Sequence, residues 1–430
     1  MDWFWPEGFY TIVMVGGFVF GAFALKLPIA VALSAAAVLG ALVGGEWFPV
    51  RHIVEGMFGY LDTILIIATA MIFMKSVQRS GLLESLAAWV IRKFRRAPLM
   101  LSLGLIFIIM APGMITGSST AAVLTTGALV APVLMKLGVD RIRTAAVIAM
   151  GAIYGMIAPP VNIPAMIIGG GIDMPYVGFA LPLLVCTVPL AVFTALVLVY
   201  PSLKRRAGDE EELEEELRRM EATPLSVRLM LPVLLMAVLM TGEQLLPSVW
   251  PALGMPVIFL LASLSALVSG GRRFDFLDSS TEALSDAIPV LGILMGVGMF
   301  IQIMTLIGVQ GFLVVSVLAL PAWLMYLGIA TSIPLFGAVS AFGAASVLGV
   351  PFLLALLGRN EIMVGSALSL IAGLGDLMPP TALAGIFAAQ VVGEENYFKV
   401  LRVCSLHGVA TAAWGIFVIA YANEIMGLLP

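Results

Sequence analysis

Polar residues and tandem prolines interrupt long apolar stretches of the sequence, and the residue types at these breaks could bind ions. The breaks in the first half of the chain contain Thr116, Gly117, Ser118, Ser119, Pro159, Pro160 and Asn162. Tandem prolines remove backbone donors and cannot continue a regular helix, so they free carbonyl groups inside an apolar segment. Carbonyls and hydroxyls suit Na⁺, whereas unpaired amide groups suit anions. We therefore expect these residues to form one ion or substrate site.

A second set of the same kind lies in the other half of the chain. It contains Ser340, Gly343, Ser346, Pro379, Pro380 and Thr381. Glycine and serine also allow close helix packing in membrane bundles, and this explains a single polar break equally well. Because two polar breaks are each followed by a Pro-Pro break at matching positions, we favour ion or substrate binding. The predicted Na⁺ ligands are Ser118, Asn162, Ser340 and Thr381.

Asp376 lies four residues before Pro380 in an apolar segment, where an unpaired charge is costly. It could coordinate a cation or bind a proton, or its carboxylate could form a hydrogen bond with the backbone or a neighbouring helix. The sequence leaves both possibilities open. There is no His-rich helix, Cys/His ligand cluster or Walker-type loop. We therefore predict no enzyme and no bound cofactor, and expect coupling to an ion gradient.

The composition is that of a polytopic membrane protein. Of the 430 residues, 61% are hydrophobic and 11% are charged, and the mean hydropathy is +1.09. A chain of this length has too little polar surface to cover a soluble globule. The net charge of −4 does not suggest a nucleic-acid partner. We expect an all-α protein within a lipid bilayer.

Basic residues indicate how the first half crosses the bilayer, because they stay on the cytoplasmic side. Basic clusters at 92–96 and 136–143 flank the apolar stretch 98–135. This stretch must therefore enter the bilayer and turn back, as a re-entrant helical hairpin with residues 116–120 at its tip. Residues 81–96 suit an amphipathic helix along the inner surface, and 144–172 form one discontinuous spanning helix.

The second half repeats this plan in the opposite direction. The charged stretch 203–228 is expected to form a cytoplasmic linker helix between two repeats, 1–202 and 229–430. In the second repeat, 321–358 forms a hairpin that opens from the outer side, and 361–392 forms a broken helix. The expected fold is an inverted-topology repeat, the architecture of many secondary transporters. Both termini are placed on the periplasmic side.

Several segments resemble the large membrane subunit, the DctM-like component, of tripartite ATP-independent periplasmic (TRAP) transporters. These segments are 114–122, 136–140, 151–160 and Met378-Pro379-Pro380. The resemblance implies an elevator-type fold like that of the ion transporter superfamily, in which hairpins and broken helices move against a scaffold. It implies Na⁺-coupled import of a small organic anion, a carboxylate, delivered by a periplasmic substrate-binding protein. It also implies a small four-helix membrane subunit as partner and the bacterial inner membrane as location.

The sequence departs from the family pattern at both proline breaks. Val161-Asn162 follows the first break where the family usually has Ser, and Met378 precedes the second where the family usually has Thr. The second hairpin, 337–349, matches the family weakly. Two other interpretations stay open: a stand-alone ion-coupled anion symporter of the same architecture, and a membrane scaffold that does not transport.

Overall fold

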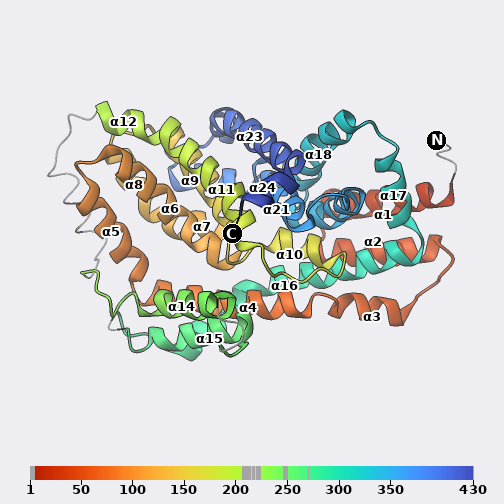
Figure 1. Ribbon diagram of the computed structural model, residues 1–430, viewed down its shortest axis with the longest axis horizontal. Helices are drawn as coiled ribbons and strands as arrows, with labels where there is room; N and C mark the ends of the chain where they lie inside the picture. Colours follow the sequence, from red (N-terminus) through yellow and green to blue (C-terminus); the bar gives the residue numbers. More distant parts are fainter. Residues whose placement is uncertain are drawn as a thin grey trace.

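The computed structural model describes residues 5–205, 215, 218, 224–245, 250–269 and 271–429. In this part of the chain all regular secondary structure is helical (Figure 1). Seven helices in this part of the chain are long and apolar enough to cross a membrane. The prediction of an all-α polytopic membrane protein is therefore confirmed. The predicted linker helix, 203–228, lies largely outside the described residues.

One group of helices packs around the long α16, directly or through a neighbour, and we call it the α16 group (Figure 1). It contains α1 (Pro6–Phe23), α2 (Ile29–Val43), α3 (Val50–Phe58), α4 (Leu61–Arg79), α14 (Leu231–Leu245), α15 (Gly254–Ala266) and α16 (Phe276–Leu306). α3 lies in line with α4, so that Val50–Arg79 forms one apolar helical stretch (Figure 1). A Cβ atom on Gly56 would lie 2.6 Å from the Gly298 carbonyl oxygen. Because glycine has no side chain, α3 can pack directly against the backbone of α16.

The remaining helices form a second group, the hairpin group, which contains two helical hairpins. The first consists of α6 (Pro98–Thr116), α7 (Ser119–Ala122), a π-helical segment (Val123–Gly127) and α8 (Ala128–Lys136). The second consists of α18 (Ala322–Gly337), α19 (Ala341–Ala344), a π-helical segment (Ala345–Gly349) and α20 (Val350–Ala355). The two hairpins therefore share one order of elements, including the π-helical segment after each tip.

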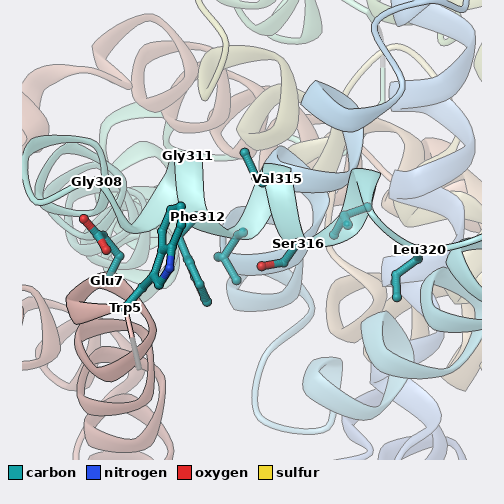
Figure 2. A pocket seen from close by; sticks show the side chains of 10 residues that line it. Trp5, Glu7, Gly308, Gly311, Phe312, Val315, Ser316 and Leu320 are labelled. Atoms are coloured by element: carbon teal, nitrogen blue, oxygen red, sulfur yellow. The ribbon is translucent and has the colours of Figure 1, made fainter. Parts of the chain in front are cut away.

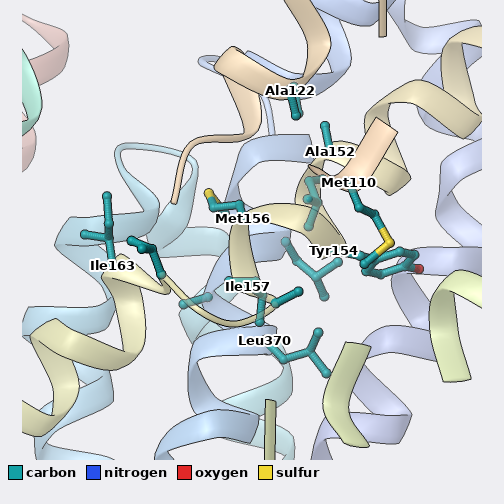
Figure 3. Close-up of a cluster of buried hydrophobic side chains, with 14 of the residues drawn as sticks. Met110, Ala122, Ala152, Tyr154, Met156, Ile157, Ile163 and Leu370 are labelled. Carbon is teal, nitrogen blue, oxygen red and sulfur yellow. The ribbon is translucent and has the colours of Figure 1, made fainter. Parts of the chain in front are cut away.

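Two broken helices form the centre of the hairpin group. They are α9 (Arg141–Ile157) with α10 (Ile163–Gly170), and α21 (Glu361–Gly373) with a 3₁₀ turn (Leu374–Leu377) and α22 (Leu383–Val391). Around them lie α11 (Ala180–Thr194), α12 (Tyr200–Arg205), α23 (Tyr397–Ala420) and α24 (Ala422–Leu428). Every α9 residue from Thr144 to Ile157 is buried, and the apolar core beside it includes Met110 and Leu370 (Figure 3).

Each hairpin touches a broken helix backbone to backbone through a pair of glycines. In the first half, a Cβ atom on Gly113 would lie 2.8 Å from the carbonyl carbon of Gly155. In the second half, a Cβ atom on Gly375 would lie 2.5 Å from the Cα atom of Gly337. Neither distance leaves room for a side chain. The same close contact is therefore built twice, once in each half.

Two helices that precede the hairpins lie at opposite ends of the molecule. α5 (Leu82–Phe94) leads into the first hairpin and α17 (Val309–Leu318) leads into the second. In Figure 1 they lie at opposite ends of α16, and both run across its direction. Corresponding helices of the two halves therefore lie at opposite ends of the molecule, an arrangement compatible with an inverted repeat. The re-entrant placement of the hairpins and the predicted domain boundaries stay predictions.

Arg359 connects the base of the second hairpin to the end of α23 by hydrogen bonds. Its guanidinium donates to the carbonyl of Ile419 at 2.8 Å, to the carbonyl of Ala420, and to the Tyr326 hydroxyl at 2.6 Å. The two carbonyls belong to the last turn of α23, where no further turn supplies an amide donor. One charged side chain thus satisfies a helix end and joins it to α18.

Replacing Arg359 with methionine should lower the free energy of unfolding, because the end of α23 loses its charged donor. A hydrogen bond to a charged group contributes about 1.5–3 kcal/mol. The thermal unfolding midpoint of the purified protein in detergent measures the loss. Arg51→Met is the control, because Arg51 forms only an exposed ion pair with Glu55 one turn away. Equal midpoints for the two variants would contradict this role of Arg359.

Candidate functional site

Gly117 and Ser118 form the tip of the first hairpin. α6 ends at Thr116, and Gly117 has a left-handed φ of 65°, which glycine adopts without strain. Ser118 caps α7, because its Oγ accepts a hydrogen bond from the Ala121 amide at 3.2 Å. The Thr116 hydroxyl donates to the carbonyl of Pro112 at 2.8 Å and accepts from the Ser118 amide at 3.2 Å. Local hydrogen bonds thus fix the position of the tip hydroxyls.

The structure brings the first tip and the first proline break together. The Val161 amide donates to the carbonyl of Met114 at 3.1 Å, which joins the break to the end of α6. A Cβ atom on Gly117 would lie 2.6 Å from Cγ1 of Ile163, so only glycine fits between tip and break. Pro159-Pro160, a cis peptide bond, lies partly buried in this break.

Asn162 ties the first break to the other half of the chain. It is fully buried and caps α10, because its Oδ1 accepts from the Ala165 amide at 2.9 Å. Its Nδ2 donates to the Ile157 carbonyl at 2.8 Å and to the Ser369 hydroxyl at 2.8 Å. The sequence did not single out Ser369, because a lone hydroxyl in a buried helix forms no motif. Its only signal is that it precedes Asp376 by seven residues on the same segment.

The second tip has the same construction and also contacts its proline break. Ser340 caps α19, because its Oγ accepts from the Gly343 amide at 3.2 Å. The Ser346 hydroxyl donates to the Gly343 carbonyl at 2.9 Å. The Thr381 hydroxyl donates to the carbonyl of Ala338 at 2.6 Å, and this bond joins break and tip. Both predicted pairings of a tip with a break are therefore present as contacts.

The second break is more open than the first. Pro379 and Pro380 are exposed and joined by a cis peptide bond. Ala382 has a φ of 37°, a region that residues other than glycine seldom occupy. The second break therefore presents a tightly turned and accessible backbone beside the second tip.

Asp376 connects the second break to the first hairpin. Its side chain is only 8% exposed, and its carboxylate accepts a hydrogen bond from the Ser119 hydroxyl. Among the described residues this is its only hydrogen bond, which leaves most of the acceptor capacity of a carboxylate for a cation or a proton. Of the two possibilities left open by the sequence, the contact with a neighbouring helix is therefore present, and it is compatible with the other.

The donor set at the tips and breaks consists of hydroxyl, carbonyl, amide and carboxylate groups. Hard cations take oxygen ligands, and Asp376 is the one ionisable side chain among the candidate residues. A single carboxylate balances one monovalent charge. The arrangement thus suits a small monovalent cation held by one carboxylate together with hydroxyl and carbonyl oxygens.

Two surface cavities lie away from the tips. One, of about 610 Å³, lies between the start of α1 and α17 and is lined by apolar side chains with Glu7 at one end (Figure 2). The other, of about 460 Å³, is lined by charged side chains that include Lys75, Arg79 and Glu282. Arg79 and Glu282 form an ion pair at 2.5 Å across it. Neither cavity contains a candidate residue.

The comparisons with known proteins agree on a transporter fold. Two solved structures resemble this chain. The YdaH transporter of Alcanivorax borkumensis has 16% sequence identity and a TM-score of 0.61, and the match covers 96% of this chain and 98% of that one. MtrF of Neisseria gonorrhoeae has 15% sequence identity and a TM-score of 0.62, and the match covers 97% of this chain and 98% of that one. At these identities the likeness shows the fold alone. No curated protein sequence matches. A family model described as tripartite ATP-independent periplasmic transporter, DctM component, matches residues 16–422, so the chain belongs to this family.

Proposed function

We propose that this transporter subunit imports a small organic anion, such as a carboxylate, in a Na⁺-coupled reaction. Its place in a secondary transporter and in a membrane follows from its family. One observation carries the finer proposal: hydrogen bonds link both tips and both breaks, and the bonds between the two halves of the chain are buried. The Ser119–Asp376 bond is the link that joins the first tip to the second break.

Na⁺ is the coupling ion that the donor set favours. The proposed ligands are hydroxyl and amide oxygens of Ser118, Asn162, Ser340 and Thr381, with Asp376 supplying negative charge nearby. An anionic substrate would be repelled by the Asp376 carboxylate, and a bound cation removes that repulsion. Cation and anion therefore favour each other's binding, which is what symport requires. A proton on Asp376 would have the same electrostatic effect, and the coupling experiment below distinguishes the two ions.

Transport would follow an elevator mechanism in which the hairpin group moves against the α16 group. Re-entrant hairpins of opposite orientation would open the site to each side of the membrane in turn. Tyr60 marks the boundary between the groups, since its hydroxyl donates to the carbonyl of Ile167 in α10 at 2.9 Å. A movement of α10 relative to α3 and α4 would break this bond.

As a DctM component, the chain acts with other components of a TRAP transporter. We propose that these are a small four-helix membrane subunit and a periplasmic protein that delivers the substrate. The proposed location is the bacterial inner membrane, with both termini in the periplasm and residues 203–228 in the cytoplasm. The stand-alone symporter and the scaffold without transport are the alternatives.

Liposomes that contain the chain, a candidate small subunit and a candidate binding protein should take up a labelled organic acid only with an inward Na⁺ gradient. Replacing that gradient with a proton gradient is the matched control, and uptake should then cease. Equal uptake without any gradient would refute the coupling. Uptake by the chain alone would favour the stand-alone symporter, and unchanged phenotypes of Ser118→Ala and Asn162→Ala in cells would favour the scaffold.

Ser119→Ala should raise the Na⁺ concentration for half-maximal uptake by roughly tenfold or more, because a hydrogen bond to a charged group is worth about 1.5–3 kcal/mol. Asp376→Asn removes the charge and should have a larger effect. Ser263→Ala is the matched control, since it deletes a buried hydroxyl bonded to the Phe259 carbonyl in α15, outside the site. If Ser263→Ala and Ser119→Ala change the Na⁺ dependence equally, the proposed site is wrong.

Tyr60→Phe should destabilise the conformation described above by about 0.5–1.5 kcal/mol, because the bond between the Tyr60 hydroxyl and the Ile167 carbonyl is lost, while that carbonyl keeps its bond with the Gly171 amide. Amide hydrogen exchange in α10 should quicken. Tyr10→Phe is the control, because no hydrogen bond of the Tyr10 hydroxyl is found among the described residues, and exchange in α10 should not change. Unaltered exchange in Tyr60→Phe would show that this bond does not hold the two groups together.

A further inference from the structure

Three exposed cations lie at the end of α5 and directly after it. Arg92, Lys93 and Arg96 are exposed, and none has an ion pair with another described residue. The nearest acidic residues along the chain are Glu84 and Asp140. These three cations within five positions form a concentrated positive patch, which we call the α5 patch.

The protein itself fixes the direction in which the α5 patch points. Leu83, Ala87 and Ile91 are buried on the opposite side of α5. A Cβ atom on Gly104 would lie 2.5 Å from Cγ1 of Val90, so α5 and α6 are in close contact. The patch therefore lies on the side of α5 that faces away from α6, and α5 lies at one end of the molecule (Figure 1).

The residues next to the α5 patch are of the types found at a membrane–water interface. The Lys93 ammonium lies 4.5 Å from the ring centroid of Trp89, a residue type enriched at that depth, and Trp89 is 38% exposed. Leu99 and Met100, at the start of α6, are 40% and 48% exposed. Apolar side chains exposed in a membrane protein face hydrocarbon. The cations directly before them in the chain thus lie at the depth of lipid headgroups.

The symmetry of the fold shows that the patch is not an architectural requirement. α17 corresponds to α5 in the second half, yet Val309–Leu318 contains no charged residue. A helix in this position can therefore lead into a hairpin without cations. The positive charge on α5 needs a separate explanation, specific to the end of the molecule where α5 lies.

We propose that Arg92, Lys93 and Arg96 bind the phosphate groups of anionic phospholipids in the inner leaflet, which anchors α5 to the bilayer surface. Their charge complements that leaflet, and each cation near an anionic surface strengthens binding by roughly fivefold. The lipid-facing position of Leu99 and Met100 places the acyl chains beside the start of the first hairpin. The proposal does not depend on the identity of the transported substrate.

The test uses the full chain in nanodiscs of mixed phosphatidylglycerol and phosphatidylcholine, with bound phosphatidylglycerol counted by native mass spectrometry after release in detergent. Neutralising the patch with Arg92→Gln, Lys93→Gln and Arg96→Gln should weaken phosphatidylglycerol binding by roughly tenfold or more. The control removes the same charge elsewhere, with Lys26→Gln, Arg51→Gln and Arg402→Gln, and should retain the lipid. Arg92→Lys with Arg96→Lys keeps the charge and should also retain it.

Two results would overturn the proposal. The first is equal phosphatidylglycerol retention by the native chain and the neutralised patch. The second is phosphatidylglycerol retention that appears only when the acidic residues within 209–216 are replaced by glutamine. In that case the acidic residues of the chain, and not the lipid, would occupy the patch in the native protein. An unchanged unfolding midpoint of the neutralised variant excludes loss of folding as the cause of lost binding.

Discussion

The whole arrangement depends on satisfying backbone groups where helices are broken inside an apolar core. Water cannot reach such groups in a bilayer, so the protein must supply the hydrogen-bond partners. The Val161 amide finds the Met114 carbonyl, and the Ala338 carbonyl finds the Thr381 hydroxyl. In the first half the hairpin supplies the partner of a group in the break, and in the second half the break supplies the partner of a group in the hairpin tip. Each hairpin and its broken helix therefore satisfy backbone groups across their contact.

This constraint also joins the two halves into one unit. Asn162 of the first half reaches Ser369 of the second, and Ser119 of the first hairpin reaches Asp376 beside the second break. Neither half has a complete polar centre without the other. A buried carboxylate is costly unless it is paired, so the contact with Ser119 supports a charge that the function proposed above requires. A ligand that displaces one tip would therefore strain the hydrogen bonds that connect it to the other half.

The sequence predicts those features that depend on local signals. Tandem prolines predict the breaks, glycine and serine between apolar runs predict the tips, and the basic cluster at 92–96 predicts an amphipathic helix before the first hairpin. Contacts between the halves could not be predicted, because Ser369 and Ser119 meet their partners only through the packing of the two repeats. The packing of α3 against α16 could not be predicted for a similar reason, because it depends on the close approach of Gly56 to Gly298.

The paired glycines at which hairpins and broken helices touch restrict how the protein can evolve. A methyl group on Gly113 would meet the backbone of Gly155, and one on Gly375 would meet the backbone of Gly337. When a larger side chain enters an ordinary core, a shorter neighbour at a second site can restore the packing. Here the neighbour is already a glycine, so no second substitution can make room. These two contacts therefore leave no route for compensated mutational drift.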